Sequence, residues 1–86
     1  MKFTVVWLPR AERELATLWE ASPDRAAVTR AADRIEQTLA GLPHRAGEVR
    51  PDGRRLLFDD PLGILFRVSL DDRLVRVTTV WDITRG

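Results

Sequence analysis

The sequence predicts a small α+β domain in which a helical hairpin packs on one face of a mainly antiparallel four-stranded sheet, in the order β-α-α-β-β-β. Three observations support this prediction. The chain has 86 residues, which suits one domain with one modest core. Its first half holds two segments with helical spacing of apolar residues, and its second half holds three short strand-like segments. We therefore treat residues 1–86 as a single domain.

The N-terminal quarter is expected to form a strand and then a helix. Residues 3–8, FTVVWL, are rich in β-branched and aromatic residues and carry apolar side chains at both odd and even positions. This pattern predicts an interior strand that is covered on part of both faces. Pro9 suits the first turn of a helix. The apolar side of that helix consists of Ala11, Leu15, Leu18 and Trp19. The spacing therefore predicts an amphipathic helix.

A second helix is expected after Ser22, which can cap it, with Pro23 at its first position. Its apolar stripe consists of Val28, Ala31, Ala32, Ile35, Leu39 and Leu42. Gly41 and Pro43 end it. Because only a short corner separates the two helices, they form an αα-hairpin, whose small alanines allow close packing.

The second half is expected to contain one polar loop and three strands. Residues 43–53 are rich in Gly, Pro and charge, which predicts a loop. The predicted strands are residues 54–59, 63–70 and 73–83. Strict alternation along the last two places Arg67 and Arg76 on the less apolar face, which the helices leave open.

Arg67 is the one cation within the apolar run GILFRVSL. Burying an unpaired charge is costly, so its guanidinium must reach water, a carboxylate such as Asp82 or Asp59, or a bound phosphate. The residues leave a structural ion pair and ligand binding equally open.

Composition excludes several classes of function. No apolar stretch approaches the roughly 18 to 20 residues of a membrane span, and the N-terminus does not read as a signal peptide, so we expect a cytoplasmic protein. The chain has no Cys and a single His, which argues against disulfides and a metal centre, and we expect no cofactor. The formal net charge is +1, although all but one of the 14 cations are arginines.

The whole chain resembles the RelE/ParE superfamily of bacterial toxins from type II toxin–antitoxin systems. The resemblance rests on VVWLPRAERELATLW, on the second helix ending in LAGLP, and on GILFRV leading to LVRVTTVWDI. It implies growth inhibition and plasmid stabilization as expected roles, and a cognate antitoxin that wraps around the toxin. It leaves the target open among the ribosome with its messenger RNA, DNA gyrase, and no target at all in a non-toxic binding homologue.

The residues that ribonuclease members of the superfamily use are largely absent here. Aligning GILFRV with the family strand places Gly63 where a catalytic Arg usually lies, and the chain has no Tyr. An altered active site would use Glu48 as base with Arg55 and Arg67 as phosphate-binding cations. His44 is a further acid–base candidate. The small net charge weakens this ribonuclease interpretation, because docking on ribosomal RNA favours an excess of cations.

A second group of residues is assigned to binding a partner protein or nucleic acid. Its members are Arg50, Arg54, Arg76, Trp81, Asp82 and Arg85. Some candidates of both groups have a simpler explanation as well: Arg54 and Arg55 can protect a sheet edge, and Glu48 can be a solvated loop charge. Trp7 and Trp19 fall on predicted core faces, so we expect them to pack and not to stack on bases.

Overall fold

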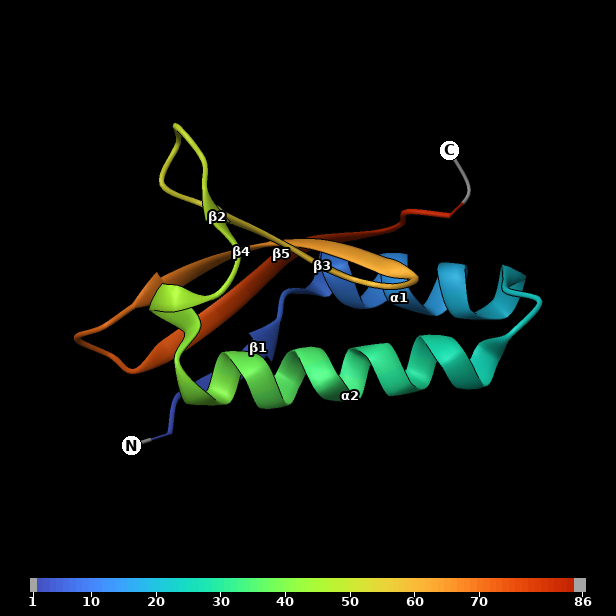
Figure 1. Ribbon diagram of the computed structural model, residues 1–86, viewed down its shortest axis with the longest axis horizontal. Coiled ribbons are helices and arrows are strands. Elements are labelled where there is room, and N and C mark those ends of the chain that lie inside the picture. The colour runs from blue at the N-terminus through green and yellow to red at the C-terminus, as the bar shows by residue number, and fades with distance from the viewer. Residues whose placement is uncertain (1, 85–86) are drawn as a thin grey trace.

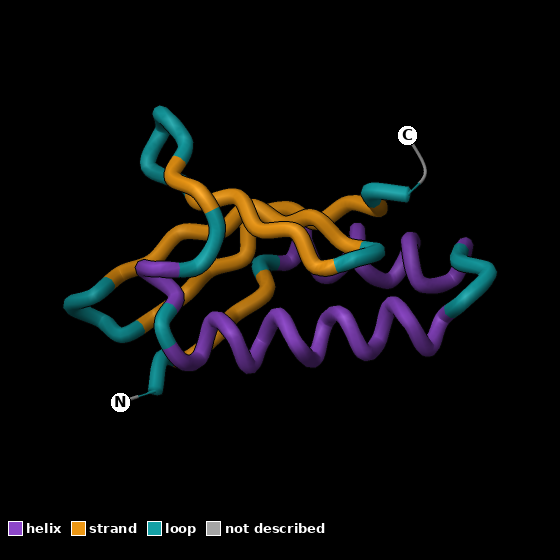
Figure 2. The backbone as a smooth tube through the Cα atoms, viewed as in Figure 1, coloured by secondary structure: helices purple, strands orange, loops and turns teal. Residues whose placement is uncertain are grey.

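The computed structural model describes residues 2–84 and shows two helices on one face of a single mixed sheet (Figure 1). The elements are β1 (Thr4–Trp7), α1 (Pro9–Ala21), α2 (Arg25–Gly41), the 3-10 helix η1 (Pro43–Arg45), β2 (Glu48–Val49), β3 (Arg55–Asp59), β4 (Leu62–Ser69) and β5 (Leu74–Asp82). The strand order is β1-β5-β4-β3-β2, with β1 parallel to β5 and the other pairs antiparallel. Figure 2 shows the helices and strands as separate layers. The predicted α+β class and element order are confirmed.

The sheet has five strands in the described part of the chain, and the prediction of four was wrong by one. The additional strand, β2, lies inside the segment expected to be a loop, and Val49 pairs with Arg55 of β3. Both β2 residues are exposed, so the pairing follows from the backbone of a hairpin and not from apolar alternation. The same segment contains η1, whose Pro43 is buried.

β1 is an edge strand, so the prediction of an interior strand was wrong. Val5 and Trp7 are half-buried, whereas Thr4 and Val6 are exposed. The helices cover only one face of the sheet, and Val6 on the other face stays 39% exposed. Its apolar character therefore reflects strand propensity and not burial on two sides.

The core lies between the helical hairpin and the covered face of the sheet. Its buried residues are Phe3, Ala11, Val28, Ala31, Ile35, Leu39, Leu62, Ile64, Phe66, Val75, Val77 and Val80. α2 begins later than expected, because Asp24 and not Ser22 caps it: the Asp24 carboxylate accepts a hydrogen bond from the Ala27 N–H at 3.0 Å. The Ser22 hydroxyl accepts from the Asp24 N–H, which orders the corner between the helices.

A β-bulge in β5 breaks the alternation on which the predicted faces depended. The register with β4 shifts between Leu65 and Phe66 and skips Thr78, whose hydroxyl donates to the Leu65 carbonyl at 3.1 Å. As a result Val77 and Val80 both face the helices and are buried. Strict alternation had placed Val80 on the open face. The bulge moves Trp81 to the open face instead.

α1 covers the edge of β5 beyond the point where β1 ends. Its Glu14 carboxylate accepts hydrogen bonds from the Thr79 hydroxyl at 2.7 Å and from the Val80 N–H at 3.1 Å. Arg10, one turn earlier, lies 3.5 Å from the other carboxylate oxygen. A side chain of α1 therefore supplies an acceptor that a neighbouring strand would otherwise provide.

Candidate functional site

The open face of the sheet carries four arginines in one line across the strands. The register of β4 and β5 places Arg67 opposite Arg76. Extending the registers of the other pairs by one residue places Arg54 opposite Arg67 and Arg50 opposite Arg54, and the Arg50 N–H donates to the Arg54 carbonyl at 2.7 Å. Directly opposite residues share a face, so these four side chains form an arginine row. The hairpin that carries Arg50 projects from the side of the sheet opposite the helices (Figure 1).

Asp52 is the counter-anion of the arginine row. Arg54 Nε donates to its carboxylate at 2.7 Å, and Arg67 Nη1 donates to its backbone carbonyl at 3.2 Å. Hydrogen bonds from the Arg54 backbone N–H and side chain, with a smaller effect of the nearby positive charges, lower the pKa of the Asp52 carboxyl. A cavity of about 350 Å³ adjoins this group, lined by Arg50, Pro51, Asp52, Arg54 and Leu65. Opposed like charges destabilise a sheet, so the row needs anions and Asp52 supplies one.

The opposite end of the open face is aromatic. Phe58, Gly63 and Trp81 stand opposite one another on β3, β4 and β5. The Phe58 and Trp81 rings meet edge to face with centroids 6.3 Å apart. A Cβ added to Gly63 would lie 2.7 Å from Trp81 Cε2, so the indole fills the space where any side chain at this position would begin. Phe58 is 56% exposed and Ile83 is 38% exposed. We call Phe58, Trp81 and Ile83 the aromatic end.

Two leucines join the arginine row to the aromatic end. Leu56 of β3 and Leu65 of β4 stand opposite each other and are half-buried. Glu48 of β2 stands opposite Leu56 on the other side of β3, so it lies on the same face of the sheet. Residues two apart on one strand are about 7 Å apart, so the face runs from charged to apolar over roughly 14 Å. A ligand with an anionic part and an apolar part would match this order.

The three residues predicted to be catalytic do not share one face. Glu48 and Arg67 lie on the open face. Arg55 lies on the other, where its Nε donates to the Ala46 carbonyl at 2.7 Å and its Nη2 donates to the Gly47 carbonyl at 3.4 Å. Gly47 has φ +64, and a Cβ there would overlap the Leu56 backbone. Arg55 therefore holds a tight turn in place.

Other candidate residues lie away from the arginine row. The Asp82 carboxylate accepts hydrogen bonds from the Thr84 N–H and hydroxyl at 2.8 and 2.6 Å. Asp59, one expected partner of Arg67, instead forms an ion pair with Arg34 of α2 at 2.8 Å, which raises the pKa of Arg34. Arg85 lies outside the described residues. Asp52, the partner that Arg67 does contact, was missed because a loop carboxylate carries no strand register.

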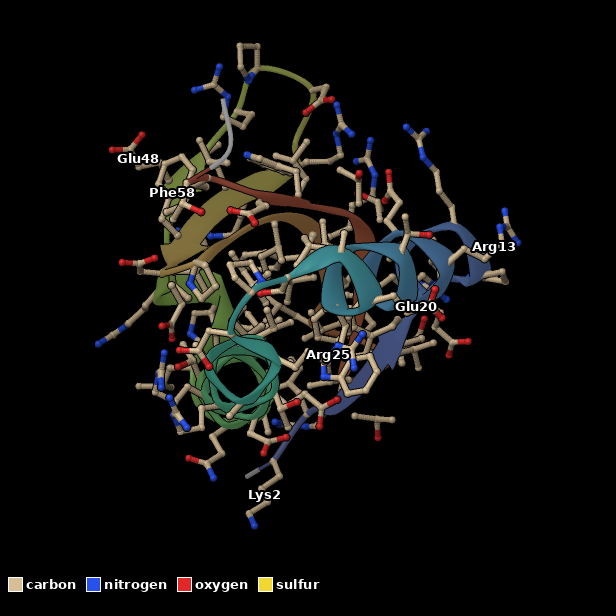
Figure 3. All side chains as sticks on the ribbon, turned by 90° about the vertical axis from the view of Figure 1, so that its right-hand side faces the viewer. Lys2, Arg13, Glu20, Arg25, Glu48 and Phe58 are labelled. Atoms are coloured by element: carbon tan, nitrogen blue, oxygen red, sulfur yellow. The ribbon has the colours of Figure 1, made fainter. Side chains whose placement is uncertain are left out.

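The remaining candidates lie near the helices or at the ends of the strands. His44 is exposed, with its ring 6.2 Å from that of Phe3. The Trp7 indole N–H donates to Glu36 at 2.8 Å, as expected for a packed tryptophan. Trp19 is 40% exposed and carries the Arg25 guanidinium 4.7 Å from its ring, so its predicted place in the core was wrong. Figure 3 shows Lys2 on the far side of the molecule from Glu48.

Residues 2–84 contain neither a metal-binding cluster nor a membrane-spanning helix. No cluster of three metal-ligating side chains occurs among them. None of their helices is long and apolar enough to cross a membrane.

Comparisons with known proteins give a match at the level of structure. Neither a family model nor a curated protein sequence matches the chain. A chain of the toxin-antitoxin complex RelBE2 from Mycobacterium tuberculosis superposes with a TM-score of 0.78 at 20% identity, covering 95% of this chain and 92% of that one. A chain of the chromosomal ParDE TA system from P. aeruginosa superposes with a TM-score of 0.64 at 17% identity, covering 95% and 97%. The chain therefore shares the fold of these chains of the RelBE2 and ParDE toxin–antitoxin assemblies.

Proposed function

We propose that the protein is the toxin component of a type II toxin–antitoxin module, that it acts in the cytoplasm, and that a cognate antitoxin neutralises it. The observation that carries the proposal is the full-length structural similarity to chains of two toxin–antitoxin assemblies. The open sheet face adds support, because it presents an arginine row, an exposed Phe58 and a half-buried Trp81 that the helices leave uncovered.

The geometry favours a toxin that acts by binding a target over one that cuts RNA. General acid–base chemistry needs its groups within hydrogen-bond reach of one substrate, but Arg55 lies on the face opposite Glu48 and Arg67. Trp81 also fills the space above Gly63, where the family resemblance implies a catalytic Arg. DNA gyrase is therefore the first target to test, and the ribosome with its messenger RNA is the second.

The experiment is controlled expression of the chain in a bacterial host, with and without the protein encoded by the adjacent reading frame. We expect growth arrest that the neighbour relieves, with uncut transcripts in RNA end mapping and reduced supercoiling by gyrase. Arg67→Glu tests the open face. Its matched control is Arg30→Glu, which changes an exposed arginine of α2.

Each alternative has its own outcome in the same experiment. Transcripts cut on translating ribosomes would reject the binding mode and favour an endoribonuclease that uses Glu48, Arg55 and Arg67. Normal supercoiling at saturating protein would exclude gyrase as the target. Unchanged growth without the neighbour would reject the toxin proposal and leave a non-toxic binding homologue.

A further inference from the structure

We propose that the groove between α1 and α2 binds a linear aliphatic polyamine, a flexible chain with ammonium groups at its ends. The groove has a volume of about 590 Å³ and combines an aliphatic floor, two indole rings and four carboxylates. It is formed by the two helices together with Trp7 of β1. None of its residues belongs to the open sheet face, so this site is separate from the proposed function and does not depend on it.

The charges that line the groove are all negative. Glu12 and Glu20 of α1 and Asp33 and Glu36 of α2 are exposed, and no arginine or lysine of the described residues lines the groove with them. None of the four forms an ion pair with another residue of the range 2–84. Glu36 accepts a hydrogen bond from the neutral Trp7 indole at 2.8 Å, which leaves its charge in place. Because these like charges repel one another across the two helices, the groove favours a cation.

The four carboxylates are spread along the groove and do not meet at one point. Within residues 2–84 no three metal-ligating side chains form a cluster that could hold an ion. Glu12 and Glu20 lie on one helix and are separated by about 12 Å along its axis. Glu36 bonds to Trp7, just before α1 begins, so it lies at the same end of the groove as Glu12. This arrangement matches an elongated cation with a charge at each end better than a compact metal ion.

The indoles and the aliphatic floor favour an organic cation over a hydrated inorganic one. The Trp19 indole N–H donates to the Thr29 hydroxyl at 3.2 Å, which fixes the ring in the wall of the groove. The Arg25 guanidinium lies 4.7 Å from the centroid of this ring but does not line the groove, so the ring already attracts one cation from the chain itself. Leu15 and Ala32 are half-buried in the floor, where methylene groups of a ligand can pack.

The length of a triamine fits the separation of the carboxylates. An extended chain advances about 1.2 Å per bond, so the terminal nitrogens of spermidine, about nine bonds apart, lie roughly 11 Å from each other. That length is close to the separation of Glu12 and Glu20 along α1. The shorter 1,4-diaminobutane spans about 6 Å, or half of the groove. Alkylammonium groups have a pKa near 10, so both compounds carry all their charges at neutral pH.

The test is a titration of the ¹⁵N-labelled chain with spermidine, followed through the tryptophan indole signals. We expect the Trp7 and Trp19 signals to shift and to saturate below about 1 mM spermidine, at a salt concentration of about 0.1 M. The Trp81 signal, on the open face, is expected to stay in place and serves as the internal control. Binding of 1,4-diaminobutane is expected to be about tenfold weaker. Magnesium chloride at the same concentrations is expected to leave all three signals unshifted.

Variants assign the binding to the groove. Glu12→Gln/Glu36→Gln removes two charges and keeps an acceptor oxygen for the Trp7 indole, and it is expected to weaken spermidine binding about tenfold. The matched control is Glu48→Gln/Asp71→Asn, which removes two exposed carboxylates elsewhere and is expected to stay within about twofold. An unchanged Trp81 signal shows that each variant is folded.

Trp19→Leu tests the aromatic wall separately from the charges. Leucine keeps the groove apolar but removes the ring, so spermidine binding, followed through the Trp7 signal, is expected to weaken about threefold.

Four results would overturn the inference. They are the absence of a shift at several millimolar spermidine, equal shifts with magnesium chloride, movement of the Trp81 signal in place of the other two, and an equal loss of binding in the control variant. Growth arrest by the chain, or its absence, concerns the proposed function and leaves the spermidine result as it stands.

Discussion

Glu14→Ala is expected to destabilise the protein strongly for a surface substitution. The Glu14 carboxylate accepts hydrogen bonds from the Thr79 hydroxyl and the Val80 N–H, both part-buried, at an edge of β5 that β1 does not reach. Alanine removes the acceptor and leaves both donors in a space lined by α1. Water reaches the site only in part, because the Glu14 side chain is 30% exposed.

The magnitude follows from the bonds that are lost. Hydrogen bonds to a charged group contribute about 1.5–3 kcal/mol, and an unpaired buried donor costs a similar amount. Partial access of water keeps the loss in Glu14→Ala near the lower end, at about 2 kcal/mol. The ion pair with Arg10 adds less than about 0.5 kcal/mol, because the Arg10 side chain is 73% exposed. A domain of this size loses about 4–8 °C in Tm per kcal/mol, so we expect a fall of roughly 10 °C.

The assay is urea unfolding followed by circular dichroism, with thermal melts as a second measurement. Glu14→Gln keeps an acceptor oxygen without the charge and is expected to lose about half as much stability. Glu12→Ala, an exposed position on the same helix, is the matched control and is expected to change stability by less than about 0.5 kcal/mol. If Glu14→Ala lies within about 0.5 kcal/mol of the unchanged chain, the edge-capping role is wrong.

Three further predictions concern single residues. Gly63→Ala is expected to lower the free energy of unfolding by about 1–3 kcal/mol and to red-shift the fluorescence of Trp81, which the new methyl group displaces. If Gly63→Ala lowers stability by the same amount in a Trp81→Leu variant, the contact with Trp81 is not the cause. Asp24→Ala removes the cap of α2 and is expected to lower the free energy of unfolding, measured in urea, by about 1 kcal/mol. An unchanged free energy of unfolding would contradict this capping role. The folded pKa of Asp52 is lowered, so its stabilising contribution is fully present above about pH 4 and is lost as pH falls through that folded pKa. Arg54→Met keeps the backbone N–H that is the main cause of the lowered pKa and removes the side-chain hydrogen bond, so a carboxyl ¹³C titration should show a partial rise in the pKa of Asp52. An unchanged titration would remove the Arg54 side chain as a cause.

Much of the fold is predictable because helices and strands follow from local patterns. Of the apolar stripe predicted for α2, Val28, Ala31, Ile35 and Leu39 are buried and Ala32 is half-buried. Leu42 was wrongly included, because α2 ends at Gly41 and Leu42 is 58% exposed. In β4 the alternation predicted Ile64 and Phe66 on the covered face, and both are fully buried. These patterns need only neighbours a few residues away, so the sequence contains them directly.

The candidate site was predictable only in part. Arg67 and Arg76 were expected on the open face, and they stand opposite each other there. Their alignment with Arg50 and Arg54 was not expected, because it depends on a hairpin at β2 whose exposed residues carry no strand pattern. The hydrogen bond from Arg67 to the Asp52 carbonyl was not expected either, because the same hairpin brings Asp52 next to Arg67.

The sequence by itself determined the class of the fold, the order of its elements and the separation of a buried face from a charged one. Only the tertiary structure decided that β1 lies at an edge, that a bulge at Thr78 turns Trp81 to the open face over Gly63, and that Arg55 faces away from Arg67. The physical reason is that periodicity reports how one segment divides between core and solvent. Register is set instead by backbone hydrogen bonds between segments distant in the chain, and a shift of one residue moves a side chain to the other face.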